Sequence, residues 1–259
     1  MQLCIDGISV NYLDLGDRSW DTVVILQGWG TRLELYSAMA EQLARHMRVL
    51  LPELPGFGQT PEPPRSFSAD DYADFTEKFL AAAGVARCSL IGHSNGGRII
   101  MKLVTRRQER FAYDRLVFMD SAGVVHEKTG KQKIRQLGYK AGRAILSLAP
   151  VKAAFPGALD DFRSRHGSAD YRAASPVMRE TLVKLVTEDF RPLMPLISQP
   201  SLLIWGTEDT DTPLSDAKVF EKLIPNAGLV EVKGAGHYAY LEHPQYVYRV
   251  LESFFGIAD

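Results

Sequence analysis

The chain has 259 residues, of which 46% are hydrophobic and 24% are charged, a composition close to the average of soluble globular proteins. It contains 30 Lys and Arg against 31 Asp and Glu, so the formal net charge is −1 and no overall basic field exists to hold a polyanion. We therefore expect no nucleic acid partner. The length fits one large domain or one domain with an insertion.

The two cysteines and the first residues indicate the compartment. Cys4 and Cys88 lack C-x-x-C spacing and fall in stretches that we predict to be strands, which argues against a disulfide framework or a zinc site. The opening MQLCIDG lacks the basic start and apolar run of a secretory signal, and no apolar run approaches the ~18 residues of a membrane span. We expect a cytoplasmic protein without a membrane span or a metal site.

The chain opens with a predicted hairpin and then alternates between strands and helices. Residues 3–5 and 8–13 are extended stretches around Asp6-Gly7, a dipeptide that favours a tight turn. Short apolar runs then alternate with helix-length amphipathic segments, the pattern of parallel strands joined by crossover helices. The runs predicted as strands are 22–26, 48–51, 88–91, 116–119, 201–205 and 229–232. Together they predict an α/β fold with a mostly parallel, eight-stranded sheet.

One connection is much longer than the others. About 80 residues separate the strand that ends near Met119 from the one that starts near Ser201, far more than a single crossover helix needs. Within this stretch, a helix is expected with Ser175 as its N-cap and Pro176 in its first turn. Its predicted apolar face consists of Met178, Leu182, Leu185 and Val186.

We interpret residues 124–196 as a helical cap inserted into a core made of residues 1–123 and 197–259. The first half of the cap contains a cluster of basic residues, which are Lys128, Lys131, Lys133, Arg135, Lys140 and Arg143. We expect a solvated helix face there. The alternative is that these charges attract an anionic substrate toward the cap.

The strongest functional motif is Gly92-His93-Ser94-Asn95-Gly96, directly after a predicted strand and directly before a helix pattern. A nucleophile on such a sharp turn has a strained backbone, and the two glycines remove side chains that would collide. The turn also places Ser94 at a helix N-terminus, which favours negative charge on a substrate oxygen. We predict that Ser94 is a nucleophile; the alternative is a glycine-rich turn without chemistry.

A serine hydroxyl is a weak nucleophile, so the prediction requires a histidine and an acid that orients it. His237 lies in a glycine-rich loop just past the last predicted strand, at the edge where parallel strands end. We interpret His93 as a support of the turn, and the other four histidines as surface or packing residues: His46, His126, His166 and His243. The loop after residues 201–205 offers three candidate acids, Glu208, Asp209 and Asp211, and spacing alone does not decide among them.

The segment Gln27-Gly28-Trp29-Gly30 follows the predicted strand 22–26. Glycines let a backbone approach a ligand closely, so we expect the N–H of Trp29 to pair with the N–H of Asn95 as donors to an oxyanion. The alternative is a tight strand-to-helix loop.

None of the G-x-G pairs in the chain completes G-x-G-x-x-G, so we expect no nucleotide cofactor and no other cofactor.

Together these motifs resemble those of the α/β-hydrolase family, including the segment Glu53-Leu-Pro-Gly-Phe-Gly. The family order of nucleophile, acid and histidine agrees with Ser94, Asp209 and His237. The resemblance implies an acyl-enzyme formed on Ser94, with His237 as base and Asp209 as orienting acid, Glu208 being the second choice. Gln27 departs from the histidine that relatives often carry at that position, and this departure bears on the oxyanion loop.

The resemblance also limits the chemistry. Dehalogenases and epoxide hydrolases of this fold need an aspartate where Ser94 stands, so both are disfavoured. Carbon–carbon bond hydrolases usually follow their histidine with tryptophan, whereas this chain has Tyr238, so we favour a serine hydrolase of small carboxylic esters. We expect Tyr238 to contact the substrate. The alternatives are a carbon–carbon bond hydrolase and a ligand-binding or receptor module with slow turnover.

Overall fold

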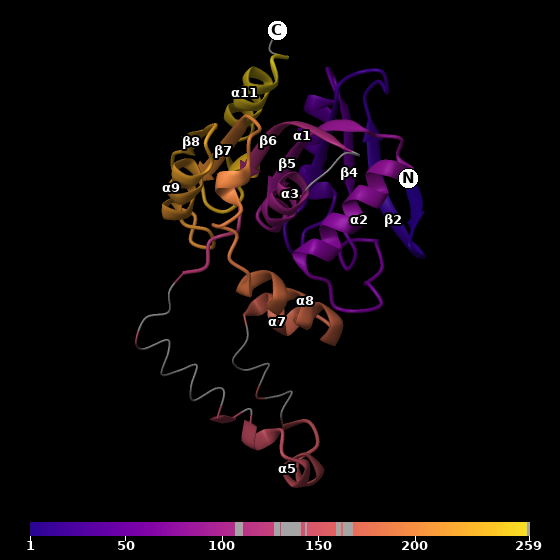
Figure 1. Ribbon diagram of the computed structural model, residues 1–259, viewed down its shortest axis with the longest axis vertical. Coiled ribbons are helices and arrows are strands. Elements are labelled where there is room, and N and C mark those ends of the chain that lie inside the picture. Colours follow the sequence, from indigo (N-terminus) through magenta and orange to yellow (C-terminus); the bar gives the residue numbers. More distant parts are fainter. Residues whose placement is uncertain are drawn as a thin grey trace.

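The structure is a computed structural model that describes residues 1–106, 111–126, 130, 141–142, 144–158, 162 and 168–257. Its centre is an eight-stranded sheet in the order β1-β2-β4-β3-β5-β6-β7-β8 (Figure 1). The strands are β1 Gln2–Ile5, β2 Ile8–Leu15, β3 Thr22–Leu26, β4 Arg48–Pro52, β5 Arg87–His93, β6 Ala112–Met119, β7 Ser201–Gly206 and β8 Ala227–Val232.

Strand pairing confirms the predicted fold class. The pairs β1–β2 and β2–β4 are antiparallel, and every other neighbouring pair is parallel. Asp6 and Gly7, with φ angles of 49° and 81°, form the turn between β1 and β2, where positive φ at both positions matches the twist of a hairpin. The carboxyl ends of the parallel strands therefore lie along one edge of the sheet.

Helices cover both faces of the sheet and bury its central strands on both sides. Val23 and Ile25 of β3 join the apolar cluster that contains α1 and α11, whereas Val24 and Leu26 join the cluster with α2, α3 and α9. Such two-sided burial explains why the strands read as continuous apolar runs. The helices are α1 Glu34–Leu43, α2 Ala69–Ala82, α3 Asn95–Thr105, α5 Ala149–Ala154, α7 Ala169–Ala173, α8 Pro176–Thr187, the 3-10 turn η1 Met194–Leu196, α9 Leu214–Leu223, α10 Ala239–Glu242 and α11 Pro244–Phe255.

The long connection between β6 and β7 contains α5, α7 and α8. Helix α8 begins as predicted, because the Ser175 hydroxyl accepts a hydrogen bond from the N–H of Met178 at 3.3 Å. Its apolar face differs from the prediction: Val186 is 47% exposed, and Thr181 is buried in its place. The Thr181 hydroxyl accepts the N–H of Phe67 at 2.9 Å, which satisfies both polar groups.

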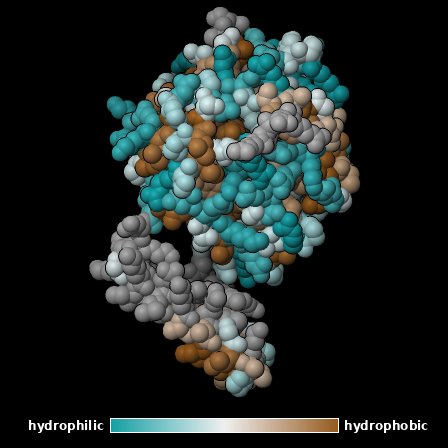
Figure 2. Space-filling view, in the orientation of Figure 1, coloured by the Kyte–Doolittle hydropathy of each residue, from teal (hydrophilic) through white to brown (hydrophobic). Residues whose placement is uncertain are grey.

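Both ends of this connection are joined at the sheet, where the N–H of Phe190 donates to the carbonyl oxygen of Gly123 at 2.9 Å. Figure 1 places α7 and α8 next to the body of the sheet and α5 farther from it. Figure 2 shows hydrophobic surface on the lobe that contains α5. The predicted basic cluster, Lys128 to Arg143, lies outside the described residues, and the extent of the cap stays a prediction.

Across the described ranges, no helix has both the length and the apolar character that crossing a membrane demands. Cys4 on β1 and Cys88 on β5 are both free thiols.

Candidate active site

The turn between β5 and α3 has the strained geometry that the sequence predicts. Ser94 lies between these elements with φ 49° and ψ −110°, a conformation that side chains rarely adopt. A Cβ atom on Gly96 would come within 2.1 Å of the Leu26 carbonyl oxygen, and one on Gly92 within 2.7 Å of the Gly96 carbonyl carbon. The predicted reason for both glycines is confirmed, since no larger residue fits at either position.

A histidine and an acid meet at the ends of the neighbouring strands. His237, in the loop after β8, has its Nδ1 2.8 Å from Oδ2 of Asp209, in the loop after β7. Asp209 is buried, and its carboxylate also accepts the N–H groups of Asp211 at 2.8 Å and Thr212 at 3.0 Å and the Thr212 hydroxyl at 2.7 Å. Glu208 is exposed, so the geometry selects Asp209 from the acidic loop.

The electrostatics of this pair favour an ionised acid. Burial would raise the pKa of Asp209, but its hydrogen bonds with His237 and Thr212 outweigh burial and lower that pKa. Burial would lower the pKa of His237, but the hydrogen bond to Asp209 and the negative charges of Asp209 and Asp120 raise it. An ionised Asp209 accepts the Nδ1–H of His237, which leaves Nε2 as the ring nitrogen able to take up a proton.

The histidine loop also contacts the turn that carries Ser94. His93 Nε2 lies 2.8 Å from the carbonyl oxygen of His237, and the two rings have centroids 5.0 Å apart. The hydrogen bonds among the described residues include none from Ser94 Oγ to His237. Such contacts are often long or poorly aligned without substrate and shorten when it binds.

The predicted oxyanion loop lies directly against the nucleophile turn. A Cβ atom on Gly28 would come 2.8 Å from His93 Nδ1 and 3.3 Å from Ser94 Cβ, so only glycine allows this approach. In the described part of the chain, neither the N–H of Trp29 nor that of Asn95 donates to another group. Their role as donors to an oxyanion stays a prediction.

Gln27, which departs from the family pattern, has a structural role that the sequence does not reveal. Its fully buried side chain donates from Nε2 to the carbonyl oxygen of Thr31 at 2.6 Å and accepts the N–H of Leu54 at 3.4 Å. The amide therefore joins both ends of the oxyanion loop to the segment that starts at Glu53. Glu53 is buried too and accepts the N–H of Gln59 at 2.7 Å.

Asp120 is a buried acid at this edge that the sequence analysis missed. It follows β6 with φ 42°, and its two carboxylate oxygens accept the N–H groups of Gly206 at 2.8 Å and Ala239 at 3.2 Å. Burial raises its pKa to about 7. Its position directly after the predicted strand 116–119 is the one signal in the sequence that pointed to this edge.

Tyr238 lies beside His237, whereas the remaining described histidines are exposed. Tyr238 is half-buried, and its ring centroid is 5.5 Å from that of His237; its contact with a substrate stays a prediction. His46 and His243 are exposed, and His126, also exposed, pairs with Asp216 at 2.9 Å. His166 lies outside the described residues.

One group of described side chains has the spacing of a metal site. Ligand atoms of Asp209, Asp211 and His237 lie within 4.8 Å of one another. Two of these residues already share the hydrogen bond between Nδ1 and Oδ2, so the cluster fits an acid–histidine pair better than a metal centre. The prediction that no metal is bound stays a prediction.

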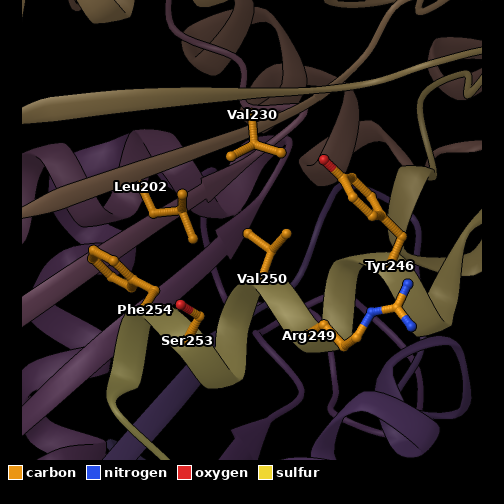
Figure 3. Close-up of a pocket in the computed structure, with 7 residues that line it drawn as sticks. All are labelled: Leu202, Val230, Tyr246, Arg249, Val250, Ser253 and Phe254. Carbon is orange, nitrogen blue, oxygen red and sulfur yellow. The ribbon is translucent and has the colours of Figure 1, made fainter. Parts of the chain in front are cut away.

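A separate apolar cavity of about 470 Å³ lies between α11 and the strands β7 and β8 (Figure 3). Its lining consists of Leu202, Val230, Tyr246, Arg249, Val250, Ser253 and Phe254. None of the residues assigned to the candidate site lines this cavity.

Replacement of Gly96 tests the tight turn. In Gly96→Ala the new methyl group would meet the Leu26 carbonyl oxygen, so we expect a loss of about 3 kcal/mol in the free energy of unfolding, measured in urea. Gly228→Ala is the control, because no atom lies within 4 Å of a Cβ there, and its effect should stay within about 0.5 kcal/mol. Equal losses in the two variants would contradict the packing argument.

Comparison with known proteins identifies relatives over most of the chain. A sequence profile described as the alpha/beta hydrolase fold matches residues 21–244. The chain is 29% identical over 239 residues to a pimeloyl-acyl-carrier-protein methyl ester esterase of Chromobacterium violaceum, covering 88% of this chain and 92% of that protein. It is 27% identical over 255 residues to a 2-hydroxy-6-oxo-6-(2'-aminophenyl)hexa-2,4-dienoic acid hydrolase of Metapseudomonas resinovorans, covering 92% and 84%.

Solved structures show the same architecture. An enol-lactonase from Burkholderia xenovorans superposes with a TM-score of 0.75 at 21% identity, covering 99% of this chain and all of that one. This likeness concerns the fold.

Proposed function

The chain belongs to the α/β hydrolase fold family, and we propose that within it the protein is a serine hydrolase that cleaves small carboxylic esters. The observation that carries this proposal is the strained Ser94 turn beside the hydrogen-bonded pair of His237 and Asp209. A strained, half-buried serine at a helix N-terminus, near a half-buried histidine that is bonded to a buried acid, is the arrangement that activates a hydroxyl for acyl transfer.

In the proposed reaction Ser94 Oγ attacks the ester carbonyl carbon while His237 Nε2 takes up the hydroxyl proton. The N–H groups of Trp29 and Asn95 hold the oxygen that becomes negative. When the carbonyl re-forms, the C–O bond to the alcohol breaks and His237 returns its proton to the leaving oxygen. Water then attacks the acyl-serine by the same route, releasing the acid and restoring Ser94.

Asp209 has a defined part in this scheme. Its carboxylate fixes the Nδ1–H tautomer of His237 and stabilises the imidazolium that forms when Ser94 loses its proton. Three donors from its own loop keep the carboxylate in place. They are the N–H groups of Asp211 and Thr212 and the Thr212 hydroxyl. The acid is therefore oriented before a substrate binds.

The helical cap over residues 124–196 is proposed to shape the substrate pocket. Helix α8 supports this role, because its Thr181 hydroxyl accepts the N–H of Phe67 at 2.9 Å and so joins part of the insertion to the core.

Covalent labelling tests the nucleophile. A fluorophosphonate probe should label the folded protein, and Ser94→Ala should lose the label and roughly 10⁴-fold or more in kcat, because the attacking oxygen is gone. Ser37→Ala is the control, since that hydroxyl on α1 donates to the Leu33 carbonyl away from the turn, and it should be labelled normally. Labelling that survives Ser94→Ala would refute the assignment.

The pH profile tests the base and the acid. His237 acts in its neutral form, so kcat/KM should rise with pH through a pKa above the ordinary ~6.5, in the direction that Asp209 shifts it. Asp209→Asn removes this charge and should move the limb to lower pH and reduce kcat roughly 10³- to 10⁴-fold. Glu208→Gln, at the exposed neighbouring position, should change neither; the reverse pattern would exchange the two acids.

A substrate panel tests the ester preference. The relative from Metapseudomonas resinovorans is named as a dienoic acid hydrolase, so carbon–carbon bond cleavage is the second candidate reaction. Hydrolysis of p-nitrophenyl esters of increasing acyl length should exceed that of a vinylogous diketone by at least about tenfold in kcat/KM, which corresponds to about 1.4 kcal/mol of transition-state binding. A preference for the diketone would replace the ester proposal, and rates no better than free imidazole with every substrate would favour a ligand-binding module.

A further inference from the structure

His93 is a buried residue that contacts the proposed machinery but is not used by the reaction itself. It is 1% exposed, and burial lowers its pKa to about 3, so the ring is neutral at any working pH. Its Nε2 faces the His237 carbonyl oxygen at 2.8 Å, and a carbonyl can only accept. Nε2 therefore carries the proton, and Nδ1 of the neutral ring is an acceptor.

The other side of the ring meets a buried tyrosine from α1. The Tyr36 hydroxyl lies 3.0 Å from His93 Nδ1, and because that nitrogen is an acceptor, Tyr36 is the donor. The same hydroxyl oxygen accepts the N–H of Gly28 at 2.9 Å. Thr31, also close to Tyr36, donates its proton to the Gly28 carbonyl at 2.8 Å.

These bonds form one continuous chain with a fixed direction. It runs from the Gly28 N–H through the Tyr36 hydroxyl to His93, and from His93 to the carbonyl of His237. Gly28 precedes Trp29, His93 precedes Ser94, and the last carbonyl belongs to His237 itself. Apart from Tyr36, each member is thus adjacent to, or part of, a residue with a proposed catalytic role.

We propose that Tyr36 and His93 are positioning residues that hold the oxyanion loop, the nucleophile turn and the histidine loop at fixed separations. This proposal rests on the proposed hydrolase function. This chain of hydrogen bonds moves no proton, because each donor has one acceptor and His93 stays neutral. It acts through geometry, and small displacements of reacting groups are costly to acyl transfer.

The packing around His93 limits how the three segments can move. The rings of Tyr36, His237, Tyr238 and Tyr240 have centroids 5.0 to 5.9 Å from that of His93. A Cβ on Gly28 would come 2.8 Å from Nδ1, so the oxyanion loop rests on the ring itself. The imidazole is therefore a spacer of defined thickness as well as a link in the hydrogen-bond chain.

Single substitutions separate the two ends of the chain. Tyr36→Phe keeps the ring and removes only the hydroxyl, which leaves the Gly28 N–H and His93 Nδ1 without partners. His93→Gln places an amide near Nε2 and can keep the bond to His237, whereas His93→Asn places one near Nδ1 and can keep the contact with Tyr36. Tyr72→Phe is the matched control, because that buried hydroxyl donates to the Pro55 carbonyl at 2.9 Å, outside the chain.

We expect Tyr36→Phe, which removes two buried hydrogen bonds, to lower kcat about tenfold, with KM changed by less than about twofold. His93→Gln should behave similarly, and the double variant should be no worse than either single one, because both break the same chain. Tyr72→Phe should reduce stability and leave kcat within about twofold. Unchanged kcat in Tyr36→Phe, or an equal loss in Tyr72→Phe, would overturn the proposal.

A measurement that needs no turnover keeps this test separate from that of the hydrolase function. Nitrogen-15 NMR of the imidazole of His93 should show a protonated Nε2 and a bare Nδ1 that stay constant between about pH 5 and about pH 9, with a shifted Nδ1 signal in Tyr36→Phe. Titration of His93 in that range, or a protonated Nδ1, would refute the proposed chain of hydrogen bonds. A wild-type protein that has this spectrum but neither labels nor hydrolyses would refute the hydrolase function alone.

Discussion

The contact of Gly96 with the carbonyl oxygen of Leu26 governs the geometry of the edge at which the candidate site lies. The start of α3 packs so closely on β3 that a Cβ atom on Gly96 would lie 2.1 Å from the Leu26 carbonyl oxygen. The helix must therefore begin directly after β5, and Ser94 takes up the positive φ that this connection requires. The same closeness brings the end of β3, with Gly28, against the turn.

The two buried acids at this edge show how hydrogen bonds decide the charge of a carboxylate. Both Asp209 and Asp120 are removed from water, which disfavours ionisation. Asp209 accepts bonds from His237, from two backbone N–H groups and from the Thr212 hydroxyl, and its pKa is lowered. Asp120 accepts two backbone N–H groups, and its pKa is raised to about 7. Burial therefore prevails at Asp120, whereas the additional donors prevail at Asp209.

The sequence was sufficient for the sheet, the family and the glycine-bounded turn, because these depend on local patterns: apolar runs, turn residues and spacing within a few positions. It was insufficient where the partners are distant in the chain. Tyr36 and His93 are 57 residues apart, and Asp120 and Ala239 are 119 apart, and no local pattern relates them. Spacing alone left the choice between Glu208 and Asp209 open for a different reason, since adjacent residues of one loop differ only in the direction of their side chains; the family resemblance chose Asp209, the residue that pairs with His237. Thr181 was passed over because its hydroxyl is satisfied by Phe67, a partner from another segment.

The bond between the Phe190 N–H and the Gly123 carbonyl closes the long connection at its base. The two stems are held there, and α8 contacts the core a second time where the Thr181 hydroxyl accepts the N–H of Phe67. The entropy of closing a loop grows with the logarithm of its length, and each doubling costs only about 0.6 kcal/mol. The number of residues between Gly123 and α8 can therefore change at little cost in closure entropy, while the strands and turns of the core stay the same.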